Sequence, residues 1–387
     1  MIEKIINENF TVSPPQKSEK RTLVSPGKEI QDGYVGSVAY SLPKPIKKLE
    51  YDLRRELKKE DLSEYLQGAR CQSRKGEELK DKNPPVTISI IHTNDLHGRH
   101  TPINTPNTGN VDMGGTPFVA SLIKELEKKE TDEASLIVDV GDVAYAPPVS
   151  DKFHFEPMAD VMNKVGYEIM TLGNHEFQWG VPVLEKEFIS KLKFPVVISN
   201  VVEKATNAPL PNTLPYIIED IKGIKVGILG LLTPKMATDA HPQVGKDVKV
   251  ENPADCARRV VKELKRLGVD VIVALTHEGL DADKELAKSV EGINLIIAGH
   301  DHEKVSDPIV VINPAGEKTL VVEAGSYGEY VGNVELMVDT DKKVIKAKYE
   351  LYPVYSKQIK PDPEVKTIVD KFLHEVGEVF HKALGIG

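Results

Sequence analysis

The segment Thr171–Gly180 has the sequence TLGNHEFQWG, in which a short apolar run leads directly into Gly173, Asn174, His175 and Glu176. A buried strand that presents polar side chains where it ends has this pattern. Four other segments repeat it after the apolar runs SIIHT, LIVDV, VIVAL and LIIAG: NDLHG at 94–98, DVGD at 139–142, THE at 276–278 and GHDH at 299–302. We therefore expect Asp, Asn and His side chains to gather at one edge of a sheet.

Around these segments the chain alternates between strand-like and helix-like patterns from Val86 onward, which predicts an α/β fold. We expect strands at 86–92, 135–140, 168–172, 195–199, 225–229, 269–276 and 294–298, and helices at 116–129, 156–165, 182–192, 253–267 and 282–290. Alternating apolar and polar residues predict antiparallel strands at 318–324, 330–338 and 343–351, followed by one helix at 361–384.

The first 85 residues differ in texture, with several prolines and runs rich in Lys and Glu. Leucines on one face predict a helix from Leu49 to Leu66, and Asp81–Pro85 resembles a linker because Pro-Pro stops regular structure. We expect an N-terminal extension at 1–85 with this one helix, a catalytic domain at 86–355 and a C-terminal helix of linker type at 356–387.

Composition narrows the class of protein. A net charge of −9 argues against extensive nucleic-acid binding, because affinity for a polyanion depends on Lys and Arg. No stretch approaches the ~20 apolar residues of a membrane span, and the N-terminus lacks the apolar core of a secretory signal. We therefore expect a cytoplasmic protein as the sequence is written, or a periplasmic or extracellular one if a signal was removed.

Five of the eleven histidines lie in the motif loops: His97, His175, His277, His300 and His302. Together with Asp95, Asp142 and Asn174 they form a mixed set of oxygen and nitrogen donors, which favours Mn²⁺, with Zn²⁺, Fe and Co²⁺ as alternatives. The donors are too many for one ion. Two divalent ions about 3.5–4 Å apart would use all of them and would suit in-line attack on a phosphoryl group.

These motifs resemble those of the calcineurin-like metallophosphoesterases, and within them the catalytic domain of 5′-nucleotidases and 2′,3′-cyclic-nucleotide phosphodiesterases. The resemblance runs from about Val86 to Gly387 and rests on HTNDLHG, GNHEF and GHDH taken together. It implies a four-layer αββα sandwich of two mixed β-sheets flanked by helices. It also implies hydrolysis of a small, nucleotide-like phosphate ester by a metal-bound hydroxide.

The resemblance further assigns the site residues. One metal would be held by Asp95, His97 and His302, the other by Asn174, His277 and His300, and Asp142 would bridge the two. His175 would bind no metal but would donate to a phosphoryl or leaving-group oxygen. Apart from the resemblance, Arg99 and Tyr145 are each either a contact for the substrate phosphate or an exposed loop residue. Trp179 is either a core packing residue or a platform for the base.

Two features depart from the family pattern. An aspartate usually follows the GNHE histidine by three residues and orients it, and here Gln178 stands at that position. Full-length nucleotidases also continue into a C-terminal domain whose aromatic side chains stack on the base, and this sequence ends at the helix before it. We therefore expect little selectivity among bases.

Two alternatives remain from the sequence. The sulfur-oxidation thiohydrolases resemble the same catalytic domain and also use two metals. A non-enzymatic scaffold of the same fold is the second alternative; scaffolds of this fold lose metal ligands, and this chain keeps all seven.

Overall fold

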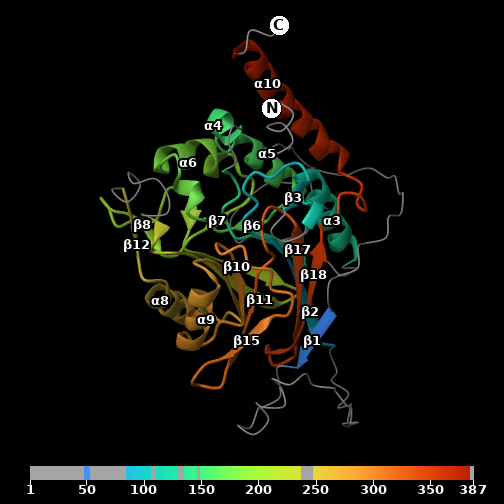
Figure 1. The fold of residues 1–387 in the computed structure, drawn as a ribbon. Helices are drawn as coiled ribbons and strands as arrows, with labels where there is room; N and C mark the ends of the chain where they lie inside the picture. Colours follow the sequence, from blue (N-terminus) through green and yellow to red (C-terminus); the bar gives the residue numbers. More distant parts are fainter. Residues whose placement is uncertain are drawn as a thin grey trace.

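The computed structural model describes residues 48–52, 84–105, 110–129, 135–145, 149–236 and 247–383. Two large sheets and a set of flanking helices make up most of these residues (Figure 1). The described part of the chain contains no helix that combines the length and the apolar character needed to cross a membrane.

The larger sheet has eight strands in the order β1-β18-β17-β2-β5-β6-β7-β9. Its members are β1 (Lys48–Asp52), β18 (Val344–Pro353), β17 (Tyr330–Val338), β2 (Val86–Thr93), β5 (Ser135–Asp139), β6 (Ile169–Met170), β7 (Val196–Val197) and β9 (Thr213–Leu214). The strands β2, β5, β6, β7 and β9 run parallel to one another. The strands β17, β18 and β1 each pair antiparallel to their neighbours. The ends of β2, β5 and β6 therefore open onto the same edge.

The smaller sheet has six strands in the order β10-β11-β13-β14-β16-β15. Its members are β10 (Tyr216–Ile221), β11 (Ile224–Leu232), β13 (Val271–His277), β14 (Leu295–Ala298), β16 (Lys318–Val322) and β15 (Ile309–Ile312). The central four are parallel and the two edge strands antiparallel. Two small pairs complete the strands: β12 (Val248–Val250) with β8 (Val201–Glu203), and β3 (Ile103–Thr105) with β4 (Asn110–Met113).

Helices pack on the outer face of each sheet, and some of them pack on other helices (Figure 1). They are α3 (Thr116–Lys129), α4 (Val149–Phe153), α5 (Glu156–Val165), α6 (Val181–Glu187), α8 (Pro253–Arg266), α9 (Leu280–Ser289) and α10 (Pro363–Ala383), with short 3₁₀ helices η1 (His175–Phe177) and η2 (Ile189–Lys191). One apolar cluster joins α3, α5 and α6 to the larger sheet, a second fills the space between the sheets, and a third joins α8 and α9 to the smaller sheet. The four-layer αββα sandwich is therefore confirmed.

Local sequence signals set several helix ends. Asn252 caps α8 by accepting a hydrogen bond from the backbone N–H of Asp255, and Pro253 occupies the first helical position. The helix α5 ends at Gly166, whose φ of 84° is the left-handed conformation that glycine adopts without a Cβ clash. The expected helices inside residues 86–383 are present with small shifts of their ends, except that the one expected at 182–192 ends at Glu187 and is followed by η2.

The N-terminal helix expected from Leu49 to Leu66 is wrong at its beginning. Lys48–Asp52 instead forms β1, which pairs with β18 at the edge of the larger sheet. Hydrogen bonds from an existing sheet edge therefore outweigh the helical spacing of the leucines. The remainder of that helix lies outside the described residues, and the division of the chain at 85 and 355 stays a prediction.

His92, near the end of β2, points into the apolar space between the two sheets. Its side chain is fully buried, neither ring nitrogen has a hydrogen-bond partner within the described residues, and the ring stacks on Tyr349. Gly332 lies opposite on β17, where a Cβ would collide with the imidazole. Burial lowers the pKa of His92 from 6.5 to about 3.

His92 should therefore make folding sensitive to acid. Below pH 6.5 the unfolded chain binds a proton here and the folded chain does not, so stability falls as the pH drops from 6.5 toward 3. Each unit by which the pKa is shifted corresponds to about 1.4 kcal/mol of free energy of unfolding. We therefore expect His92→Leu to lose less stability than the wild type when the pH falls from 7.5 to 5.

Urea denaturation in the presence of a chelator measures this difference without metal loss. His374→Leu is the matched control, because the His374 side chain is 74% exposed on α10. An equal loss of stability in wild type and His92→Leu would contradict the prediction.

Candidate metal centre

The motif loops all leave the carboxyl ends of parallel strands, and several of their residues adopt left-handed backbone conformations. Positive φ values occur at Asp95 (50°), His97 (46°), Asp142 (55°), His300 (90°) and His302 (63°). Such conformations are uncommon for residues with a Cβ and persist where the surroundings hold them. Five of the twelve non-glycine residues with positive φ in the described part of the chain therefore lie in these loops.

Asp95 is buried, and its two carboxylate oxygens have different contacts. Oδ2 accepts hydrogen bonds from the side-chain amide of Asn94 at 2.8 Å and from the backbone N–H of His300 at 3.0 Å. Oδ1 has no hydrogen-bond partner within the described chain and lies 3.4 Å from His302 Nε2 and 3.8 Å from His277 Nε2. One oxygen therefore fixes the carboxylate, and the other faces the imidazoles.

Asp142 repeats this arrangement. Its Oδ1 accepts the backbone N–H of His175 at 2.8 Å, and its Oδ2 lies 3.2 Å from His277 Nε2 and 3.9 Å from His97 Nε2. Gly141 and Gly173 let the two loops approach this closely, because a Cβ on Gly141 would overlap the backbone of Gly173 and one on Gly173 would overlap Asp142. Asp142 therefore lies centrally among the donors.

Glu176 holds the Asp142 loop in place. Its carboxylate accepts backbone N–H groups of Asp142 at 2.7 Å, Val143 at 2.9 Å and Gly173 at 2.6 Å. Burial and the nearby Asp142 raise the pKa of Glu176 to about 7. Through these three hydrogen bonds Glu176 orders the loop.

The histidines present free nitrogens toward the carboxylates. His277 Nδ1 donates to the backbone carbonyl of Val140 at 2.9 Å, which leaves Nε2 directed at Asp142 and without a hydrogen-bond partner among the described residues. A second partner on the opposite ring nitrogen is the usual way in which a protein orients a metal-binding histidine. The carboxyl groups around it outweigh the lowering effect of burial and raise the pKa of His277 to about 10, with Asp142 contributing most.

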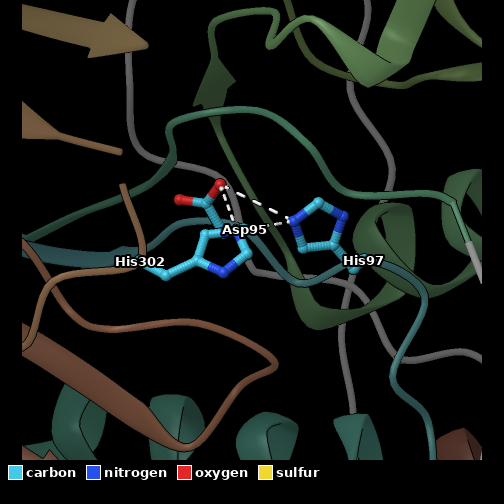
Figure 2. Close-up of side chains that lie close together, drawn as sticks. All are labelled: Asp95, His97 and His302. Carbon is cyan, nitrogen blue, oxygen red and sulfur yellow. Dashed lines mark hydrogen bonds and ion pairs between the residues drawn. The ribbon is translucent and has the colours of Figure 1, made fainter. Parts of the chain in front are cut away.

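The remaining donors complete the cluster. The Nε2 atoms of His97 and His302 lie 2.9 Å apart, and both lie near Asp95 Oδ1, at 3.8 and 3.4 Å (Figure 2). His300 Nδ1 lies 3.0 Å from the side-chain oxygen of Asn174. Two facing imidazole nitrogens need a proton or a cation between them, because two lone pairs at that distance repel each other.

Three groups within the described residues have donor atoms close enough together to hold an ion. They are Asp95 with His97 and His302, Asp95 with Asp142 and His277, and His97 with Asp142 and His175. Orphaned buried donors, a concentration of carboxylates and oriented imidazoles all fit divalent cations. Five of the seven predicted ligands belong to these groups, and so does His175, which the resemblance gave no metal role. The other two, Asn174 and His300, contact each other and line the same cavity.

A cavity of about 440 Å³ opens onto the donors. Its lining consists of His97, Arg99, Asp142, Tyr145, Asn174, His175, His300, His302 and Tyr327. The Arg99 guanidinium lies 5.1 Å from the centre of the Tyr327 ring, so this residue borders the cavity and its contact with substrate stays a prediction. Trp179 is half-buried and packs against the apolar cluster that contains Phe155.

Sequence reasoning missed several residues that shape this cavity. Asn94 accepts from the backbone of Ala324 and donates to the carbonyl of Gly325, which ties the first motif to the chain after β16. Tyr327, with φ of 58°, donates its backbone N–H to the carbonyl of Asp95 at 2.7 Å. Asn94 could have been found from its place inside the NDLHG motif, whereas Tyr327 follows no pattern in the sequence.

Comparison with known proteins agrees with this geometry. The family model of calcineurin-like phosphoesterases matches residues 88–304, and the chain belongs to this family. A trifunctional nucleotide phosphoesterase of Bacillus subtilis is 31% identical over 77% of this chain and 21% of its own length. The crystal structure of a 5′-nucleotidase precursor from Thermus thermophilus is 27% identical, with a TM-score of 0.65 over 77% of this chain and 59% of that one.

A sulfate thiohydrolase of Thermus thermophilus also shares the fold. It is 18% identical with a TM-score of 0.65 over 77% of this chain and 61% of that one, and so low an identity shows the fold alone. The chain spans between about a fifth and about a half of the length of the curated relatives it matches. The thiohydrolase alternative is therefore the weaker one.

Replacement of Glu176 by Gln should loosen the centre. An amide offers one acceptor oxygen where the carboxylate offers two, so at least one of the three N–H groups loses its partner. A buried donor left unpaired costs about 1–3 kcal/mol. We expect Glu176→Gln to lower the free energy of unfolding by this amount and to weaken metal binding. Denaturation and metal titration measure the two effects.

The exposed Glu291 provides the matched control, Glu291→Gln. A Glu176→Gln variant that retains both wild-type stability and wild-type metal affinity would show that the three hydrogen bonds do not hold the loop.

Proposed function

We propose that this chain hydrolyses small phosphate esters of the nucleotide type with two bound divalent cations. One observation carries the proposal. Asp95 and Asp142 each use one carboxylate oxygen to accept backbone or amide N–H groups and direct the other at histidine nitrogens. A protein whose buried carboxylates served packing alone would pair both oxygens.

The proposed ligand sets are those that the resemblance implies. Asp95, His97 and His302 would hold one cation; Asn174, His277 and His300 would hold the other; and Asp142 would contact both. The pairs His97 with His302 and Asn174 with His300 each lie about as close as two ligands of one ion. When bound, the cations supply charge neutralisation at the phosphoryl oxygens and a water of lowered pKa. Mn²⁺ is the proposed metal, because mixed nitrogen and oxygen donors suit it.

His175 takes the part of proton donor. Its ring borders the cavity, and its Nε2 lies 4.0 Å from Asp142 Oδ2. In hydrolysis, water supplies the oxygen that bonds to phosphorus and releases a proton. The bond from phosphorus to the ester oxygen breaks with its electron pair on that oxygen. His175 gives a proton to this oxygen and regains one from the proton that water releases.

A nucleotide monoester is the proposed substrate class. The family match shows a phosphoesterase, and the relatives described above are a nucleotide phosphoesterase and a 5′-nucleotidase precursor. Arg99 at the rim of the cavity is the proposed contact for the substrate phosphate. A cytoplasmic location, from the sequence, stays a prediction.

Metal analysis tests the centre directly. After reconstitution with Mn²⁺ and removal of free ions, we expect the wild-type chain to carry close to two ions and to hydrolyse 4-nitrophenyl phosphate. Asp142→Asn should retain about one ion or fewer, because Asp142 is the proposed ligand of both ions.

Asp281→Asn serves as the control, because the Asp281 side chain is 97% exposed on α9. Elemental analysis showing one ion or none in the wild type would contradict the two-metal centre, and two ions without hydrolysis of any phosphate ester would contradict the activity.

Selectivity among bases should be low. The two tyrosines that line the cavity already contact protein groups, because Tyr145 stacks on His175 and Tyr327 lies against Arg99 and His97. Hydrophobic discrimination is worth only a few kcal/mol even with a dedicated pocket. We expect kcat/KM for AMP, GMP, CMP and UMP to agree within about tenfold. A larger preference for one base, measured by phosphate release, would show that the chain has a base pocket.

A further inference from the structure

His175 lacks the hydrogen bond that would orient its ring. Its Nδ1 is buried and has no hydrogen-bond partner within the described residues, so the amide of Gln178, three residues on, does not accept from it. The backbone N–H of Gln178 instead donates to the carbonyl of His175 at 3.1 Å. A histidine that transfers protons needs a third group to hold its ring in one orientation. Another contact must therefore fix the plane of this imidazole.

Tyr145 provides a flat surface against that ring. The two ring centres are 4.5 Å apart and the planes differ by 12°, which is a parallel stack. Tyr145 comes from the loop that follows Asp142, and the backbone N–H of His175 donates to the Asp142 side chain. The same loop therefore holds His175 twice. Tyr145 stacks on its side chain, and Asp142 accepts a hydrogen bond from its backbone.

Other aromatic rings pack near Tyr145. Trp179 lies at a tilt 6.3 Å from Tyr145, and Phe155 packs edge-on against Trp179 at 5.0 Å. Phe155 stacks in turn on Phe188, and both are fully buried. Tyr145 also borders a small cavity of about 10 Å³, too small for a side chain to move into. The phenol ring is thus held between the core and the metal centre.

We propose that Tyr145 is a positioning residue for His175. The phenol ring holds the plane of the imidazole and so directs Nε2 toward the oxygen of the leaving group. The ring face does this, and the phenol hydroxyl is not needed. This inference rests on the proposed phosphoesterase function, in which His175 donates the proton.

The structure argues against a different use of Tyr145, as a platform for the base of a nucleotide. One face of its ring is covered by His175, and Trp179 lies at a tilt 6.3 Å away. A base that stacked on the covered face would have to displace the His175 imidazole. Loss of the Tyr145 ring should therefore affect the turnover step and leave substrate binding almost unchanged.

The proton transfer gives a specific signature. An alkoxide leaving group, as in AMP, requires a proton when the P–O bond breaks, whereas 4-nitrophenolate leaves as a stable anion. We expect His175→Asn to lower kcat for AMP by roughly 10²–10⁴-fold, and kcat for 4-nitrophenyl phosphate much less. Tyr145→Leu should show the same dependence on the leaving group in smaller measure. An aromatic stack of ordinary strength corresponds to a decrease of about 3- to 10-fold in kcat for AMP.

The experiment uses the full chain reconstituted with Mn²⁺ and compares Tyr145→Leu, Tyr145→Gln, Tyr145→Phe and His175→Asn on both substrates. Tyr145→Phe keeps the ring and should retain kcat within about twofold, whereas the two variants without a ring should lose turnover of AMP at nearly unchanged KM. Metal content should equal that of the wild type in all Tyr145 variants. Tyr355→Leu removes an exposed tyrosine outside the cavity and is the matched control.

Several outcomes would overturn the proposal. A rise in KM at constant kcat in Tyr145→Leu would make Tyr145 a substrate contact. Equal losses of kcat on both substrates, or a loss in Tyr145→Phe as large as in Tyr145→Leu, would exclude orientation by the ring. If His175→Asn shows the dependence on the leaving group and the Tyr145 variants do not, only the positioning role fails. If His175→Asn lowers kcat equally for AMP and for 4-nitrophenyl phosphate, the proton-donor role fails and the positioning role fails with it.

Discussion

The buried carboxylate of Asp142 is the constraint on which the metal centre depends. It lies between loops from β5 and β6, accepts the backbone N–H of His175 and faces His277 from the other sheet. Glu176 closes the arrangement by accepting the backbone N–H of Asp142 itself and of Gly173. A buried charge in this position is tolerated because one oxygen accepts a hydrogen bond and the other faces an imidazole.

This constraint explains why two sheets are needed. The larger sheet supplies Asp95 and Asp142, and the smaller sheet supplies His277 together with the loop that carries His300 and His302. Burial disfavours the charged carboxylates, yet the imidazoles from the second sheet offset this effect and hold the pKa of Asp95 below its usual value. The apolar cluster between the sheets therefore also brings opposite charges together. Packing and electrostatics favour the same arrangement of layers.

The sequence was sufficient for the parts of the structure that follow from local pattern. Parallel strands end at one edge, so five motif loops after five apolar runs predicted that the seven donors would meet, and they do. The predictions were wrong or incomplete where pairing with a neighbouring strand decides the conformation. Lys48–Asp52 is extended because β18 offers an open edge, and the short edge strands β10 and β15 were missed for the same reason. Sequence pattern contains no information on such neighbours.

Side-chain orientation is the second limit on prediction from sequence, and His175 illustrates its consequence. From the sequence, Gln178 was the residue to consider as its partner, yet the ring that stacks on His175 belongs to Tyr145, thirty residues earlier in the chain. The buried acids Asp95, Asp139, Asp142 and Glu176 already concentrate negative charge around this centre. Another carboxylate beside His175 would add to the charge that burial penalises. An aromatic face restrains the same ring and adds no charge, so a stacked tyrosine is the orienting contact that the electrostatics of this site accommodate at the lower cost.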